Sequence, residues 1–292
     1  MQYFPELTQS LPYLLLAAAI IASCTRFREI TVPVLGVASV ALAYAANIID
    51  LTALPAIATL AVCAAVISQN RSKSNRPIWW LVFVAISALA IAMSMHIMPG
   101  FNNLQIVKNI QVTKDAIPYT LYWNFDKGIV GLALLYAVSN AKPDSRQSPF
   151  LIVSTVLAVL ILITFPIAVK LGAVSWAPKI PEILLVWIVS NLLITCIAEE
   201  AFFRGLWQQT AADTLRKYTR HGPVIALVLV SILFGLLHFP GGPVYMGLAT
   251  IAGLAYGAAY HLTGRLEAAI AVHFLFNLTH LMLFTYPLKA VS

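Results

Sequence analysis

The sequence predicts an all-α polytopic membrane protein with about eight to ten transmembrane helices. Of its 292 residues, 60% are hydrophobic and only 10% are charged, and the mean hydropathy is +0.86. Soluble domains carry about 25% charged residues. The apolar residues are concentrated in stretches that approach the roughly 20 residues a helix needs to cross a hydrocarbon core. These observations exclude an ordinary soluble domain.

Ten apolar stretches predict the helices in chain order, and mostly short polar connections separate them. The count falls towards eight if one of the two short stretches, 11–25 or 128–141, does not cross. The predicted helices cover residues 11–25, 30–49, 51–69, 78–98, 128–141, 150–170, 184–207, 223–238, 244–261 and 266–286.

The one long connection, residues 99–127, is too polar to span a membrane and too apolar to be a simple linker. It is rich in Tyr and Trp, whose rings settle at headgroup depth, so an interfacial position is the first interpretation. A lid that contacts substrate is the alternative.

The polar residues divide the chain into two sections. Residues 1–175 are predicted to form accessory transmembrane helices, together with the interfacial segment 99–127, and few charges lie inside those helices. Residues 180–290 contain the last four predicted helices and every polar cluster that suggests chemistry. These four helices are therefore the predicted functional core.

Charge and cysteine content narrow the function classes further. The net charge is +7, but the basic residues lie in short loops between apolar stretches, which indicates membrane topology rather than nucleic-acid binding. The cysteines Cys24, Cys63 and Cys196 are far apart within apolar stretches, so they form neither a disulfide framework nor a zinc-binding spacing. The lipid bilayer is the partner that this composition implies.

Three charged residues lie close together in the apolar stretch Ile188–Trp207, namely Glu199, Glu200 and Arg204. Charges at membrane depth are costly and usually functional. In an α-helix Glu200 and Arg204 share a face, whereas Glu199 points elsewhere. Two carboxylates in different environments can take separate acid and base roles. Glu199 is then the candidate general base, and the alternative is a charge network that only locks helices together.

Two further pairs of residues at helical spacing follow, and each contains a histidine. Phe234 precedes His238 by four residues at the end of one predicted helix, and His273 precedes Asn277 in the same way on the last helix. Imidazole and amide donors held on one face can stabilise a developing oxyanion. A lone histidine such as His238 can equally be a hydrogen-bonded core residue.

The ninth predicted helix carries Gly253 and Gly257, a pattern of small residues four apart that permits close helix approach. It predicts tight packing against neighbouring helices, which a shared site would need.

These motifs resemble those of the CPBP family, the CAAX proteases and bacteriocin-processing enzymes also called Abi. The resemblance covers about the last 110 residues, and the first six predicted helices carry no such signature. The motifs occur in the family's order as E-E-x-x-x-R (Glu199, Glu200, Arg204), F-x-x-x-H (Phe234, His238) and H-x-x-x-N (His273, Asn277).

The resemblance implies a glutamate-type intramembrane endopeptidase that needs no cofactor, with the last four helices as its catalytic core. Glu199 and His238 would activate a water molecule for attack on a peptide bond, and His273 and Asn277 would form the oxyanion hole. The expected supporting residues are Glu200, Arg204 and Phe234.

A zinc enzyme remains an alternative, because two histidines and two carboxylates could ligate zinc and activate its bound water. The absence of an H-E-x-x-H motif disfavours it. Two other readings are a proton-coupled transporter that uses intramembrane Glu and His residues as a relay, and a non-catalytic bacteriocin-immunity protein.

The family's habits also imply a place and a substrate. The expected location is the bacterial inner membrane. Eukaryotic family members remove tripeptides from prenylated C termini, a modification that most bacteria lack. The expected substrate is therefore a small peptide, a bacteriocin precursor or the tail of a membrane protein.

Overall fold

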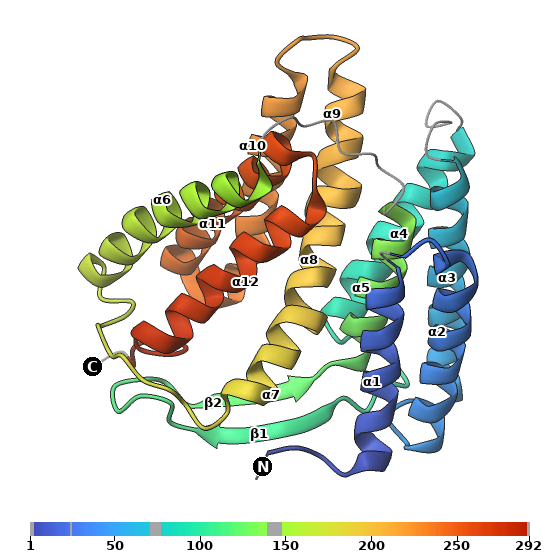
Figure 1. Cartoon of the computed structure of the whole chain (residues 1–292), viewed down its shortest axis with the longest axis horizontal. Helices are drawn as coiled ribbons and strands as arrows, with labels where there is room; N and C mark the ends of the chain where they lie inside the picture. Colours follow the sequence, from blue (N-terminus) through green and yellow to red (C-terminus); the bar gives the residue numbers. More distant parts are fainter. Residues whose placement is uncertain (1–2, 24, 71–76, 139–147, 291–292) are drawn as a thin grey trace. The chain divides into compact units, whose positions relative to one another are not determined.

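The computed structural model describes residues 3–23, 25–70, 77–138 and 148–290, and most of these residues are helical (Figure 1). Every one of the ten stretches predicted from the sequence contains a helix, so the all-α class is confirmed. The helices are α1 (Leu7–Ala22), α2 (Arg28–Ala45), α3 (Leu54–Asn70), α4 (Pro77–Ser94), α5 (Phe125–Val138), α6 (Pro149–Lys170), α10 (Gly222–Leu236), α11 (Gly242–Thr263), α12 (Leu266–Leu283) and a long composite helix that runs from Leu184 to Leu215.

Six helices of the described chain are long and apolar enough to cross a membrane: α2, α3 with the 3-10 turn η1 (Leu51–Ala53) before it, α4, α6, the composite helix and α12. A seventh span results if α10 and α11 count as one, since they bend by 54° at the turn η5 (Phe239–Gly241). The helix α5, with 14 residues, extends only about 21 Å. It is therefore shorter than the roughly 30 Å hydrocarbon core.

The long connection at 99–127 contains secondary structure that the sequence analysis did not predict. Strands β1 (Leu104–Ile110) and β2 (Tyr119–Trp123) pair as a two-stranded antiparallel sheet (Figure 1). The segments LQIVKNI and YTLYW are rich in β-branched and aromatic residues, which favour strands. The residues between them carry none of the Asn-Gly signals of a tight hairpin, so the pairing was not evident.

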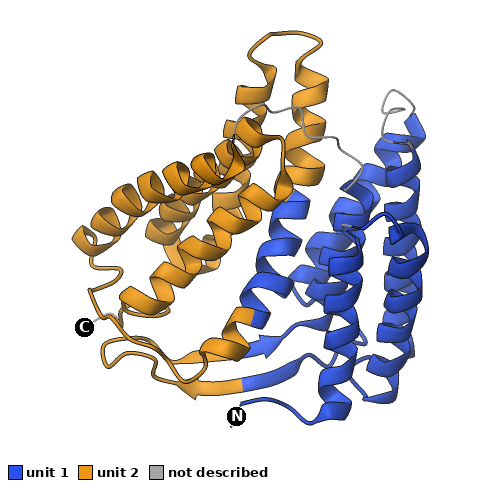
Figure 2. Ribbon diagram, in the orientation of Figure 1, with its two compact units in different colours: residues 1–106, 121–141, 189–202 blue, residues 107–120, 142–188, 203–292 orange. Residues whose placement is uncertain are grey.

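The described chain forms two compact units whose segments interleave along the sequence (Figure 2). Unit 1 comprises residues 1–106, 121–141 and 189–202, and unit 2 comprises residues 107–120, 142–188 and 203–292. These two units are defined by contacts within the structure. The division into accessory helices 1–175 and a core 180–290 concerns function, and it stays a prediction.

In unit 1 the central element is α5, which packs against α1, α3 and α4. All its residues are buried except Lys127, Ala133 and Tyr136, which are half-buried. It also packs against the part of the composite helix that belongs to this unit. A short helix buried on nearly every side is thus surrounded by longer apolar helices.

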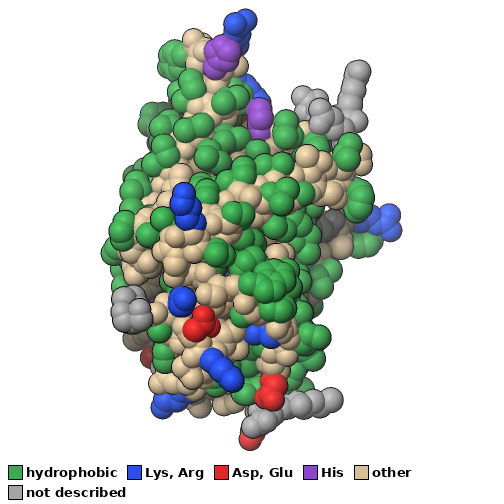
Figure 3. All heavy atoms as spheres, turned by 90° about the vertical axis from the view of Figure 1, so that its left-hand side faces the viewer, with side chains coloured by type: hydrophobic (Ala, Val, Ile, Leu, Met, Phe, Trp, Pro, Cys, Tyr) green, Lys and Arg blue, Asp and Glu red, His purple; other side chains and the backbone are tan. Residues whose placement is uncertain are grey.

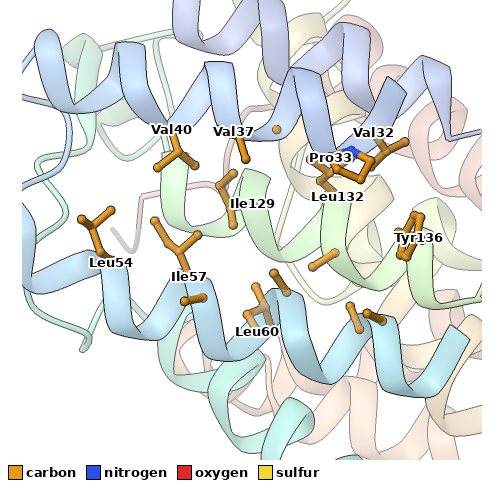
Figure 4. A pocket seen from close by; sticks show the side chains of 16 residues that line it. Val32, Pro33, Val37, Val40, Leu54, Ile57, Leu60, Ile129, Leu132 and Tyr136 are labelled. Atoms are coloured by element: carbon orange, nitrogen blue, oxygen red, sulfur yellow. The ribbon is translucent and has the colours of Figure 1, made fainter. Parts of the chain in front are cut away.

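A groove of about 460 Å³ lies in unit 1 between α2, α3 and α5 (Figure 4). Val37, Val40, Ile57 and Leu132 are among its lining side chains, and Tyr136 contributes the one side-chain hydroxyl. Walls of this kind offer almost no hydrogen bonds, so at membrane depth the groove suits hydrocarbon rather than water.

In unit 2, α11 packs against α10, α12 and α6. The sequence predicts α6 as one of the accessory helices, but α6 lies against α11 and α12, two helices of the predicted core. Phe165 of α6 stacks on Phe284, with ring centroids 4.0 Å apart. Elsewhere on its surface α6 exposes large hydrophobic residues, including Phe150 and Leu162. Hydrophobic side chains predominate on the face of the molecule that Figure 3 shows, as expected for a surface in contact with lipid.

Among the cysteines, Cys63 and Cys196 are buried and neither forms a disulfide, as the sequence predicts. Cys24 lies outside the described residues.

Candidate active site

The composite helix that carries Glu199, Glu200 and Arg204 is not a regular α-helix. It begins with α7 (Leu184–Val189) and ends with α9 (Gln209–Leu215). Between them, η3 (Ser190–Cys196) and η4 (Ala201–Gln208) are π-helical and flank the single α-helical turn α8 (Ile197–Glu200). A π-helix closes hydrogen bonds five residues apart and is frequent at functional sites. The assumption of regular α-helical spacing between Glu200 and Arg204 was therefore wrong, and their pairing stays a prediction.

Glu199 has an ionic partner that the sequence analysis missed. Lys127 of α5 places its Nζ 2.7 Å from Glu199 Oε1, within unit 1. The two side chains are only 16% and 17% exposed. Glu200, in the same turn, is fully buried. The sequence offered a weak signal, because Lys127 sits at the start of an apolar stretch, but nothing in it indicated the contact with Glu199.

Arg204, in unit 2, is completely buried among aromatic rings. Its guanidinium carbon lies 4.9 Å from the ring centroid of Phe234 and 5.5 Å from that of Tyr256. Its Nη2 also donates a hydrogen bond of 2.7 Å to the carbonyl oxygen of Gly253. Cation–π contacts of this kind contribute about 2 kcal/mol when the site is desolvated.

Gly253 and Gly257 of α11 perform the packing role predicted from the sequence. A Cβ atom at Gly253 would lie 3.2 Å from Phe234 Cδ1, and one at Gly257 would lie 3.1 Å from Leu227 Cγ. The close approach also exposes the carbonyl of Gly257 to Gln208, whose Nε2 donates to it at 3.1 Å. Gln208 follows Arg204 by four residues, and this polar stripe was a signal that the sequence analysis overlooked.

His238 lies just after the end of α10 and is held by the residue one turn before it. Its Nδ1 is 2.6 Å from the carbonyl oxygen of Phe234, and its ring centroid is 4.5 Å from that of Phe234. A carbonyl oxygen only accepts hydrogen bonds, so Nδ1 carries a proton. In the neutral ring Nε2 then holds the lone pair, which is the form a general base needs.

His273 of α12 is buried and stacks on Tyr256, with ring centroids 4.3 Å apart and an interplanar angle of 13°. Its ring also meets Phe234 edge-on at 6.1 Å. Asn277, one turn further along α12, is half-buried. Phe234 therefore contacts His238, His273 and Arg204, and it is the common centre of the unit 2 residues.

The predicted site residues are divided between the two units. Unit 1 holds Glu199 and Glu200, and unit 2 holds the residues around Phe234. Within either unit, the described residues contain no group of three His, Cys, Asp or Glu side chains arranged to bind a metal ion.

The described residues thus form a helical, multi-pass membrane protein that buries carboxylate, arginine and histidine side chains at Glu200, Arg204 and His273. Residues 181–279 match the family model described as type II CAAX prenyl endopeptidase Rce1-like, and all three motifs fall inside the match. This match confirms the resemblance to the CPBP family over residues 181–279. No curated protein and no solved structure gave a significant match.

Proposed function

We propose that this chain is a glutamate-type intramembrane endopeptidase that hydrolyses a peptide bond with an activated water molecule. The match over residues 181–279 carries the proposal, because it contains all the residues that the mechanism needs. The site geometry within each unit is consistent with the roles assigned to them.

Glu199 and His238 together activate the water. The hydrogen bond from His238 Nδ1 to Phe234 supports this role, because it orients the ring and leaves Nε2 as the acceptor. As the water attacks the peptide carbonyl, its proton passes to Glu199 and His238, which act together as the general base. The same proton then moves to the leaving amine, so that the base is regenerated.

His273 and Asn277 donate hydrogen bonds to the oxyanion of the tetrahedral intermediate. Donors fixed in place before the reaction cost no reorganisation, and this is why a rigid setting favours catalysis. The stack of His273 on Tyr256 supplies such rigidity on the histidine side. Glu200, Arg204 and Phe234 support the site without touching the reacting atoms.

The substrate is a peptide or protein segment presented at the membrane, and the location is the bacterial inner membrane. The family's description names CAAX prenyl endopeptidases. For this chain the candidates are a small peptide, a bacteriocin precursor and the tail of a membrane protein, and prenylated C termini belong in the same test.

The test is cleavage of quenched fluorogenic peptides by the full chain in detergent. The panel contains a farnesylated C-terminal CAAX peptide, its unprenylated form and a library of unmodified sequences. Glu199→Ala and His238→Ala should abolish cleavage that wild type shows, and a chelator should leave it unchanged. Loss on chelation would instead favour a zinc enzyme, and full activity in Glu199→Ala would overturn the mechanism.

A further inference from the structure

We propose that Lys127 is a positioning residue for Glu199. Its ammonium is an ionic partner of the carboxylate and fixes the direction of that side chain, so the accessory helix α5 completes the catalytic apparatus. The inference rests on the proposed function and adds a residue that lies outside all three family motifs and outside the matched segment 181–279.

The ion pair itself is short and largely removed from solvent. The Nζ–Oε1 distance is 2.7 Å, and both side chains are more than four-fifths buried. An exposed ion pair contributes little because water screens it. A partly buried carboxylate, in contrast, depends on its partner for charge stabilisation, because solvent no longer supplies it.

Lys127 is held in place from the N-terminal end of α5. Asn103 accepts a hydrogen bond from the Phe125 backbone N–H at 2.8 Å. Asp126, which is buried, accepts from Asn103 Nδ2 at 3.0 Å and lies 2.7 Å from His96 Nδ1. Asp126 also accepts from the backbone N–H of Lys127 at 2.8 Å. The first turn of α5 is therefore hydrogen-bonded to Asn103 and His96, which precede it in the chain.

The helix α5 also packs closely against the helical turn that contains Glu199. Gly131 follows Lys127 by four residues and so lies on the same face of α5. A Cβ atom at Gly131 would lie 3.3 Å from the Cα and Cβ atoms of Ala198, the residue just before Glu199. Only a glycine gives this approach without displacement, and the approach brings the Lys127 ammonium within reach of Glu199.

The arrangement is compatible with Glu199 acting as a base. A carboxylate offers about four lone-pair positions on two oxygens. The ammonium at Oε1 therefore occupies only part of this capacity. Loss of the ammonium would leave this partly buried carboxylate without the cation that fixes its direction.

The alternative is that the ion pair only stabilises the packing of α5 against the composite helix. Variants that remove the positive charge and then restore it distinguish this structural role from a positioning role. Lys127→Met keeps the length of the side chain and removes the ammonium, whereas Lys127→Arg keeps a cation. Lys127→Cys treated with bromoethylamine recreates an ammonium at nearly the same position. Arg216→Met, which breaks the exposed pair of Arg216 with Asp213, is the matched control for loss of a cation.

Each variant is assayed as the full chain in detergent on the peptide that wild type cleaves fastest, with kcat, KM and thermal stability measured together. Wild type given the same bromoethylamine treatment controls for the other cysteines. Lys127→Met should lower kcat by about 10- to 100-fold with KM unchanged, since misplacing a catalytic group costs up to about 100-fold. Lys127→Arg and aminoethylated Lys127→Cys should recover most of the loss, and Arg216→Met should match wild type.

Wild-type kcat in Lys127→Met overturns the inference, and so does an aminoethylated variant that regains stability without regaining kcat. In both cases Glu199→Gln remains inactive and the proposed function stands. If Glu199→Gln cleaves as well as wild type, or if wild type cuts no peptide, the proposed function itself fails and takes the inference with it.

Discussion

His273 and Tyr256 are stacked almost in parallel, with centroids 4.3 Å apart, although they come from different helices, α12 and α11. A stacked ring restricts the imidazole to a narrow range of orientations. Aromatic pairs of this kind contribute about 0.5–1.5 kcal/mol beyond the area they bury. An oxyanion donor benefits from such restriction, because its N–H must already point at the reacting atom.

Replacing Tyr256 with Leu should therefore impair catalysis more than binding. We expect kcat to fall by about 2- to 10-fold, the equivalent of the stacking energy, with KM unchanged. Tyr256→Phe keeps the ring and is the matched control. Steady-state kinetics of both variants checks the prediction, and an equal loss of kcat in Tyr256→Phe would show that the hydroxyl, not the stack, is what matters.

Arg204 is expected to be a stability residue first and a catalytic support second. Arg204→Met removes a buried cation from aromatic rings and leaves the carbonyl of Gly253 without its 2.7 Å donor. Together these losses should cost about 2–4 kcal/mol of the free energy of unfolding. Thermal melting in detergent measures it, with Arg216→Met as the control at an exposed site. A melting temperature equal to that of the control would contradict the importance assigned to the aromatic setting.

Gly253 should tolerate no side chain, whereas Gly247 on the same helix should. A Cβ atom at Gly253 would lie 3.2 Å from Phe234 Cδ1 and 3.3 Å from the Ser231 carbonyl oxygen, but one at Gly247 meets nothing within 4 Å. Overpacking costs about 1–3 kcal/mol, while Gly→Ala in an open helix position gains up to about 1 kcal/mol. Melting curves should therefore show opposite signs for Gly253→Ala and Gly247→Ala.

The same pair of variants also tests the site. A displaced Phe234 moves the carbonyl that orients His238, so Gly253→Ala should lose activity as well as stability. Gly247→Ala should retain both. If Gly253→Ala melts early but cleaves normally at low temperature, the orientation of His238 does not depend on the packing of α11.

The sequence predicted the positions of the helices well, because a long run of apolar residues is a simple signal. It predicted eight to ten membrane spans, whereas six helices of the described residues, or seven with the bent pair, are long and apolar enough to cross. It also predicted the packing of Gly253 and Gly257, since small residues at that spacing have few other uses. The β1–β2 sheet was missed because its strands are short and the segment between them has no tight-turn signature. The assumption of regular α-helical spacing was wrong after Glu200, because no feature of the sequence indicates the π-helical turns there.

Partners from distant parts of the chain were beyond reach of sequence reasoning. Lys127 and Glu199 are separated by 72 positions, and no periodicity links them. The role of Gln208 could have been predicted more easily, because Gln208 follows Arg204 by four residues as a second polar residue in an apolar stretch. Tyr256 lies between two glycines that had already been assigned to packing, and its contact with His273 depends on how α11 and α12 meet.

Tyr119 in β2 gives a prediction about pH that is independent of catalysis. Burial raises the pKa of its phenol from 10.0 to about 12, and hydrogen bonds with Tyr286 and Trp187 oppose the shift. Above pH 10 the unfolded chain releases this proton while the folded chain keeps it, so folding stability falls as pH rises. At pH 11 the loss should be about 1 kcal/mol.

Tyr119→Phe removes the ionisable group and keeps the ring, which packs edge-on against Tyr286 with centroids 5.1 Å apart. The melting temperature of wild type should therefore fall more steeply between pH 9 and pH 11 than that of Tyr119→Phe, while the two agree at pH 8 apart from a constant offset. Other tyrosines and the lysines titrate equally in both proteins and cancel in the difference. Parallel curves over the whole range would mean that the Tyr119 hydroxyl reaches water in the folded protein, and that the β2 strand does not enclose it.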